Sequence, residues 1–157
     1  KDIDARWTTK NHEKHYGYKN HTKVDLKTKF ITKYKTTSAN VHDSQMLDES
    51  LERRDRRKKL YGDSAYRSTE IEELLKCKKI KSMIHEKGYR NNPLTDKQKK
   101  RNKAKSKIRA RVEHVFGFIE NTMKGSFVRC IGINRANCVI GLMNITYNMN
   151  RYMQLEA

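Results

Sequence analysis

Residues 60–85, LYGDSAYRSTEIEELLKCKKIKSMIH, hold the pattern that decides the fold. The stretch from Leu60 to Tyr66 predicts a short strand followed by a turn, and Ile80 to His85 predicts a second short strand. Between them, Ser68 or Thr69 can cap a helix whose apolar residues recur at helical spacing. A strand–helix–strand unit predicts a mixed α/β fold with helices on the faces of a sheet.

The flanking sequence extends this pattern in both directions. Upstream, residues 16–37 predict a hairpin with its turn at residues 25–29, and a helix capped by Asp43 or Ser44 follows to about Arg54. Downstream, residues 88–93 form a loop, and Asp96 opens a long helix that ends at Gly125. A final helix from about Arg135 is expected to bury Val139, Ile140, Met143, Tyr147 and Tyr152.

The charge of the chain points to a polyanionic partner. Its 157 residues include 36 Lys and Arg against 18 Asp and Glu, a formal net charge of +18. Such a field attracts DNA or RNA. No segment approaches the roughly 20 apolar residues of a membrane-spanning helix, so no membrane partner is expected.

The cysteine content indicates the redox state of the cellular compartment and excludes some kinds of site. The three cysteines are an odd number without CxxC spacing, which argues against a disulfide framework and a zinc knuckle. We therefore expect a reducing cytoplasm.

The long helix predicted for residues 96–125 changes character along its length. Nine of the fifteen residues from Lys97 to Arg111 are Lys or Arg, and none is acidic. We expect these residues to contact DNA phosphates, although a plain solvated face would have the same composition; the candidates are Lys99, Lys103, Lys107 and Arg111. The apolar face appears only later, at Ile108, Val112, Val115, Phe116, Ile119 and Met123.

Two carboxylates are candidates for chemistry. Asp63 follows a predicted strand, where α/β folds place their ligands, but an Asp beside Gly62 is also an ordinary turn residue. Glu113 borders the apolar stripe of the long helix, but with Arg109 four residues earlier it could equally form an ordinary surface ion pair. His42 with Asp43, and His85 with Glu86, match no metal-binding spacing and are expected in loops or at a helix cap. The aromatic residues Tyr16 and Tyr18 are expected to pack across strands.

Four segments together resemble the insertion-sequence DDE transposases of the group called IS five. Their order and spacing match across nearly the whole chain, and they comprise Tyr16–Lys19 with Val24–Asp25 and Lys27–Thr28, Ala39–Ser44, Tyr61–Tyr66, and Arg109–Gly117. The third and fourth of these segments resemble the blocks that hold the second catalytic Asp, here Asp63, and the catalytic Glu, here Glu113.

The resemblance implies an RNase H-like fold in which two aspartates and a glutamate hold two Mg²⁺ or Mn²⁺ ions. In-line cleavage of a phosphodiester needs charge stabilisation at the attacking and leaving oxygens, which two such ions provide. Arg109 takes the position of the family's phosphate-binding or bracing Arg. Two positions depart from the family: Glu120 stands where a Lys is common, leaving Lys124 as a substitute, and Ser106 stands where a Tyr is common.

The resemblance implies that the first catalytic Asp lies on a strand upstream of Lys1, and Asp2, Asp4 and Asp25 do not match its motif. The resemblance also implies a bacterial, nucleoid-associated protein that needs no small-molecule cofactor. Residues 1–157 are accordingly expected to form a single partial catalytic domain, the C-terminal portion, that lacks its first strand. We expect the parent protein to be a DNA transposase, a homodimer or larger, and this chain alone to be inactive. Two alternatives stay open: a truncated, inactive DNA-binding remnant of a transposase, and an unrelated basic RNA-binding protein.

Overall fold

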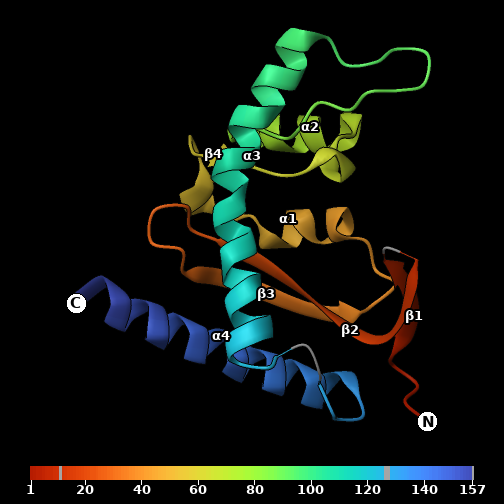
Figure 1. Ribbon diagram of the computed structural model, residues 1–157, viewed down its shortest axis with the longest axis vertical. Helices are drawn as coiled ribbons and strands as arrows, with labels where there is room; N and C mark the ends of the chain where they lie inside the picture. The colour runs from red at the N-terminus through yellow and green to blue at the C-terminus, as the bar shows by residue number, and fades with distance from the viewer. Residues whose placement is uncertain (11, 126–127, 157) are drawn as a thin grey trace. The chain divides into compact units, whose positions relative to one another are not determined.

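The computed structural model describes residues 1–10, 12–125 and 128–156, which form two compact units (Figure 1). The first unit comprises residues 1–46 and 112–157, and the second comprises residues 47–111. Helices and small sheets are mixed in the chain, so the expected mixed α/β class is correct.

The first unit contains a three-stranded antiparallel sheet in the order β1-β2-β3. These strands are β1 (Arg6–Lys10), β2 (Glu13–Val24) and β3 (Ile31–Ser38). The predicted hairpin is therefore confirmed, and β1 adds a third strand that pairs with β2. At its turn, the Asp25 carboxylate accepts hydrogen bonds from the Lys27 and Thr28 amides at 3.1 and 2.9 Å. Tyr16 packs across strands against Trp7, with ring centroids 5.1 Å apart, as expected of an aromatic pair in a sheet.

Helix α4 (Ile133–Glu156) lies along β2 and β3 and closes the core of the first unit (Figure 1). The buried face of α4 includes small and polar residues as well as apolar ones, namely Ala136, Ile140, Gly141, Asn144 and Tyr147. The core beneath it contains Ile31, Val115 and Ile119.

The predicted apolar stripe of α4 was partly wrong. Ile140 and Tyr147 are buried, but Val139 and Tyr152 are exposed. The physical reason is the close approach of α4 to the sheet: a Cβ on Gly141 would overlap the Tyr34 hydroxyl. The Asn144 amide also exchanges hydrogen bonds with Asn20 on β2, so a polar residue occupies the buried face.

The acidic residues near the N-terminus hold that segment against the start of α4. Asp2 accepts hydrogen bonds from the Tyr18 hydroxyl at 2.6 Å and from the Gly132 amide at 3.1 Å. Asp4 accepts one from the Ile133 amide at 3.0 Å. The hydrogen bonds that Asp2 accepts, that of Tyr18 foremost, lower the pKa of Asp2 to about 2. Asp2 and Asp4 thus have a structural role at a helix N-terminus, where negative charge is stabilising.

The second unit is built around two short parallel strands, β4 (Lys59–Leu60) and β5 (Lys81–Ser82), with α2 (Thr69–Cys77) between them in sequence. Ser68 caps α2 by accepting a hydrogen bond from the Ile71 amide at 3.2 Å, as predicted. The core of this unit is apolar and comprises Leu47, Leu51, Ile71, Leu75, Ile80 and Ile84.

The helix predicted from Asp43 to about Arg54 is broken into three short pieces. They are the 3₁₀ turn Asp43–Met46, α1 (Leu47–Ser50) and the 3₁₀ turn Arg53–Asp55. The break comes where the Asp55 carboxylate accepts a hydrogen bond from the Glu52 amide at 2.8 Å and starts a new turn. Leu47 and Leu51 are nevertheless buried, as their spacing predicted.

The long basic helix is α3 (Asp96–Gly117), which begins in the second unit and ends in the first. It continues into a π-helical turn at Phe118–Thr122, so the helical segment ends slightly before the predicted end at Gly125. Gly125 lies where a side chain has no room, because a Cβ there would be 2.7 Å from Ile119 and 2.9 Å from the Met143 sulfur. Of the apolar stripe that we predicted for this long helix, Val115 and Ile119 are buried and the other residues are only half-buried.

Candidate functional site

Asp63 lies at the carboxyl ends of the two parallel strands. Hydrogen bonds from the Met83 amide to Leu60 O (2.8 Å) and from the His85 amide to Gly62 O (3.1 Å) continue the parallel pairing beyond β4 and β5. Asp63 follows directly and caps a 3₁₀ turn by accepting a hydrogen bond from the Ala65 amide at 2.8 Å. The turn role and the strand-end position that we predicted are therefore both real.

Two cations on α3 lie at the ends of these strands, and one of them is paired with Asp63. The Arg109 guanidinium is 3.5 Å from Asp63 Oδ2, and the side chains are 31% and 46% exposed. Lys105, one helical turn earlier, donates a hydrogen bond to Ile84 O at 2.8 Å, at the end of β5. Positive charge is therefore fixed at the same strand ends as Asp63.

His85 completes the cluster at these strand ends. Its Nε2 atom is 3.4 Å from the Ser106 hydroxyl. Partial burial lowers the pKa of His85, the charges of Arg109 and Lys105 lower it further, and the charge of Asp63 opposes them. The imidazole is therefore held in its neutral form at neutral pH. We refer to Asp63, His85, Lys105, Ser106 and Arg109 as the Asp63 cluster.

The prediction of His85 as an ordinary loop residue missed this environment, and Lys105 and Ser106 were not considered as site residues. The sequence contained one indication of it: residues 105 and 106 each lie three or four positions from both 102 and 109, so all four lie on one side of a helix. Ser106, the position where the resembled family often has Tyr, faces His85. The missing information was which strand this side of the helix would contact.

Glu113 is an exposed side chain on α3, four residues after Arg109. Its neighbour Val112 is half-buried and Val115 is fully buried, so Glu113 borders the core-facing side of the helix as predicted. Glu113 belongs to the first unit and Asp63 to the second. Their participation in one reaction stays a prediction.

The predicted phosphate-binding residues separate into two groups by position. Lys99, Lys103, Lys107 and Arg111 follow one another at intervals of four and are all exposed on α3. We refer to them as the basic stripe. Lys124 is exposed but lies beyond the π-helical turn with a left-handed backbone (φ 55°), so it does not extend the face of the helix.

Two of the segments that carry the family resemblance are bound to each other within the first unit. The Lys19 ammonium donates a hydrogen bond to Val41 O at 2.8 Å. His21 Nδ1 lies 2.7 Å from Asp43 Oδ1, and His21 Nε2 lies 2.7 Å from the Thr37 hydroxyl. Asp43 therefore binds His21, whereas the Ser44 amide at the start of the following turn donates its hydrogen bond to His42 Nδ1 at 3.3 Å. These motif residues join β2 to the segment after β3.

The described residues by themselves do not assemble a metal site. Within residues 1–10, 12–125 and 128–156, no group of three or more His, Cys, Asp or Glu side chains lies close enough to hold an ion. The Asp63 cluster contains a single carboxylate, which is paired with Arg109, whereas Mg²⁺ favours several oxygen ligands. The expected metal ions therefore require ligands beyond this cluster.

None of the described helices combines the length and apolar character needed to cross a membrane. Comparison with known proteins gives a consistent family assignment. Residues 1–149 match the family model described as "Transposase DDE domain". The chain is similar to the transposase for insertion sequence element IS1106 of Neisseria meningitidis serogroup B, with 34% identity over 149 residues.

That match covers 95% of the chain and 51% of the relative, so the chain spans about half the length of the curated transposase it matches. No solved structure matches. The order of the motif segments, the family model and this relative agree, and the chain belongs to the family of transposase DDE domains.

Proposed function

We propose that the intact protein cleaves and rejoins phosphodiester bonds at the ends of an insertion sequence, within an RNase H-like fold. Asp63 and Glu113 are two of its catalytic carboxylates in this proposal. The observation that carries it is the Asp63 cluster, in which a carboxylate at the ends of two parallel strands is paired with Arg109, while Lys105 is bound at the end of the second strand. Ligands of α/β folds bind at this end of the strands.

The surroundings of Asp63 suit a phosphodiester. An isolated carboxylate repels a phosphate, but Arg109 and Lys105 reverse the local charge. Arg109 can present two parallel N–H groups to phosphate oxygens, while Lys105 acts as a point charge. Neutral His85 adds a group that can donate or accept a hydrogen bond without further charge. These residues would position the DNA backbone at Asp63.

Transposases with this domain generally use divalent metal ions. Asp63 and Glu113 are the carboxylates of this chain that we propose as ligands for Mg²⁺ or Mn²⁺. Two divalent ions carry four positive charges, whereas two carboxylates supply only two negative ones. We therefore propose that a further aspartate of the intact protein, outside these 157 residues, is the third carboxylate ligand. The ions would supply charge stabilisation to the oxygens of the scissile phosphodiester.

The proposal is tested by transposition of a marked insertion sequence, using the full-length protein that carries this chain. We expect Asp63→Asn and Glu113→Gln each to reduce transposition by more than the roughly 10–100-fold cost of removing a residue that only supports a metal ligand. Asp96→Asn and Glu120→Gln are matched controls, because both residues are exposed acids of the same helical segment. They should leave transposition within about twofold of wild type.

Two outcomes would contradict the proposal in different ways. Wild-type transposition by Asp63→Asn or Glu113→Gln would remove that residue from the catalytic set. A full-length wild-type protein that binds insertion-sequence ends but never transposes would instead support the alternative, a DNA-binding remnant without chemistry.

A further inference from the structure

The loop between β5 and α3 is a short hairpin with an exposed, basic tip. The Tyr89 and Asn92 backbones exchange two hydrogen bonds of 3.0 Å, which leaves Arg90 and Asn91 as a two-residue turn. Residues 87–93 are all exposed, and residues 87–95 contain no acidic side chain. Tyr89 is 61% exposed at this tip, and the Lys87 ammonium lies 5.7 Å from the centre of its ring.

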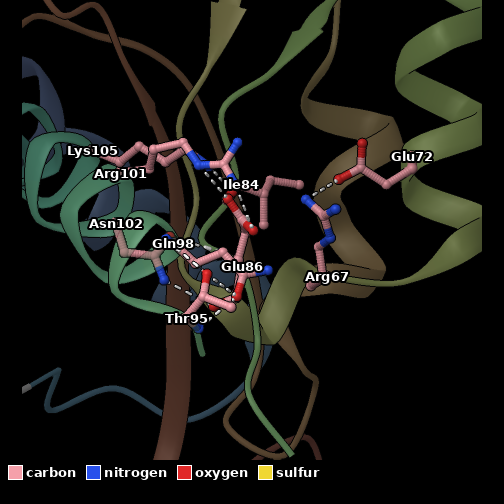
Figure 2. A network of polar contacts seen from close by, with 9 residues as sticks. All are labelled: Arg67, Glu72, Ile84, Glu86, Thr95, Gln98, Arg101, Asn102 and Lys105. Carbon is pink, nitrogen blue, oxygen red and sulfur yellow. Dashed lines mark hydrogen bonds and ion pairs between the residues drawn. The ribbon is translucent and has the colours of Figure 1, made fainter. Parts of the chain in front are cut away.

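The chain entering this hairpin, at Glu86, is hydrogen-bonded to α3, as Figure 2 shows. The Asn102 side chain accepts a hydrogen bond from the Glu86 amide and donates one to Glu86 O, both at 2.9 Å. The Arg101 guanidinium is 3.2 Å from the Glu86 carboxylate. A side-chain amide that satisfies both backbone groups of one residue fixes the direction in which the chain leaves the strand.

The chain leaving this hairpin is fixed by a capping box at the start of α3. The Thr95 hydroxyl accepts a hydrogen bond from the Gln98 amide at 3.3 Å, and the Gln98 side chain accepts one from the Thr95 amide at 2.8 Å (Figure 2). Between these two segments, Gly88 lies against Leu94, where a Cβ would come within 3.2 Å of the leucine side chain. The hairpin is therefore tethered at both ends and closed at its base.

Such fixation has no evident benefit for the fold, because the tip itself buries nothing. The core of the second unit is complete without it, since the nearest core residue in sequence is Ile84. A rigid support does benefit binding, because it removes most of the entropy cost of ordering a loop on its ligand. An exposed aromatic ring between two cations, in a loop without acidic residues, is suited to nucleic acid: the ring stacks on a base and the cations contact phosphates.

We propose that this hairpin is a base-stacking site, in which Tyr89 stacks on an unpaired DNA base while Lys87 and Arg90 contact the flanking phosphates. The proposal rests on the transposase function proposed above and deepens it. Paired bases within a duplex present only their edges, so a tyrosine ring can stack only where a base is unpaired. The hairpin would therefore favour DNA that is locally opened or frayed over a continuous duplex.

The test measures binding of the purified 157-residue chain to two fluorescein-labelled DNAs by fluorescence anisotropy at one salt concentration. One DNA is fully paired, and the other is the same duplex with a short unpaired segment. We expect tighter binding to the opened DNA, and we expect Tyr89→Ala to weaken that binding by roughly 5- to 150-fold, the range for loss of one stacked base. Binding of the paired DNA should change by less than about twofold.

Two variants control for trivial effects. Tyr89→Phe keeps the ring and should retain the preference for opened DNA, whereas Tyr152→Ala removes a similarly exposed tyrosine (56%) from α4 and should have no effect. Equal affinity of the wild-type chain for both DNAs, or an unchanged preference in Tyr89→Ala, would overturn the stacking site while leaving the transposase proposal intact. Failure of the wild-type chain to bind either DNA would count against both.

Discussion

Individual residues of the motif segments serve the fold as well as any chemistry. The His21 side chain is only 8% exposed and lies between the Asp43 carboxylate and the Thr37 hydroxyl. The hydrogen bond from His21 to the Asp43 carboxylate is the main reason that the pKa of Asp43 is lowered, and the charge of Lys19 lowers it further. A motif residue can therefore be required for stability even where it is remote from catalysis.

We predict that Asp43→Asn destabilises the chain by about 1 kcal/mol at neutral pH. A hydrogen bond to a charged group contributes about 1.5–3 kcal/mol, and solvent weakens this one because Asp43 is half-exposed. Since the folded-state pKa is depressed, the stabilisation is complete above the unfolded pKa of about 3.9 and is lost as pH falls through the folded value. The stability difference should therefore close below about pH 4.

Urea unfolding of both proteins between neutral pH and about pH 3 measures this difference. Asp96→Asn is the control, because Asp96 is 91% exposed and its replacement should change stability by less than about 0.5 kcal/mol. A gap between Asp43→Asn and wild type that is constant with pH would show that the charge of Asp43 does not stabilise the fold.

At the scale of the element, α3 presents two different faces. Asn102, Lys105 and Arg109 face the strand ends and the base of the hairpin loop, where each has a fixed partner. The basic stripe occupies exposed positions of the same helix. One run of basic residues in the sequence thus contains residues that hold the strand ends to the helix as well as exposed cations.

We predict that Asn102→Ala loosens the hairpin loop without unfolding the second unit. The substitution removes both hydrogen bonds to the Glu86 backbone, so the loop should open more often and expose the bonds after Lys87 and Arg90. Limited trypsin digestion followed by mass spectrometry should show cleavage at Arg90 about five- to tenfold faster than in wild type, as expected for a decrease of about 1–1.5 kcal/mol in local stability.

Lys103→Ala is the matched control for Asn102→Ala, because this neighbouring residue is exposed on the same helix. It should leave cleavage at Arg90 unchanged. Equal cleavage rates in Asn102→Ala and wild type would mean that the loop is held by its other contacts alone.

At the scale of the whole molecule, the dominant property is the net charge of +18. This charge is unevenly distributed. The charged residues of α4 are Arg135, Arg151 and Glu156, whereas α3 contains nine Lys and Arg residues. The exposed apolar residues of α4 include Leu142, Ile145 and Met149. DNA is accordingly expected on α3, and the homodimer or larger assembly stays a prediction.

We predict that the basic stripe determines much of the salt dependence of DNA binding. Substituting Lys99, Lys103 and Lys107 by Ala should reduce the slope of log affinity against log salt by about 0.9 for each phosphate that the variant no longer neutralises, or about 2.7 if all three lysines bind phosphates. The control replaces Lys58, Lys76 and Lys81, which are exposed in the same unit and change the net charge equally. Equal slopes for the two triple variants would identify the effect as one of net charge alone.

Local sequence patterns predicted the mixed α/β class, the β2–β3 hairpin and a cap of α2 at Ser68 or Thr69, and they singled out the two candidate carboxylates. These features depend on local patterns: alternation, turn chemistry, capping residues and the position of an acid after a strand. The basic composition of the chain also predicted a nucleic-acid partner, because charge acts at long range whatever the fold.

Only the tertiary structure decided which residues act together. Val139 and Tyr152 are exposed because α4 approaches the sheet through Gly141 and Asn144, an approach that depends on Tyr34 and Asn20 from distant strands. Likewise, His85, Lys105 and Ser106 form one cluster only because the chain that follows β5 lies against α3. Periodicity gives the faces of a helix, but the partner of each face depends on contacts between residues far apart in sequence, which no local pattern encodes.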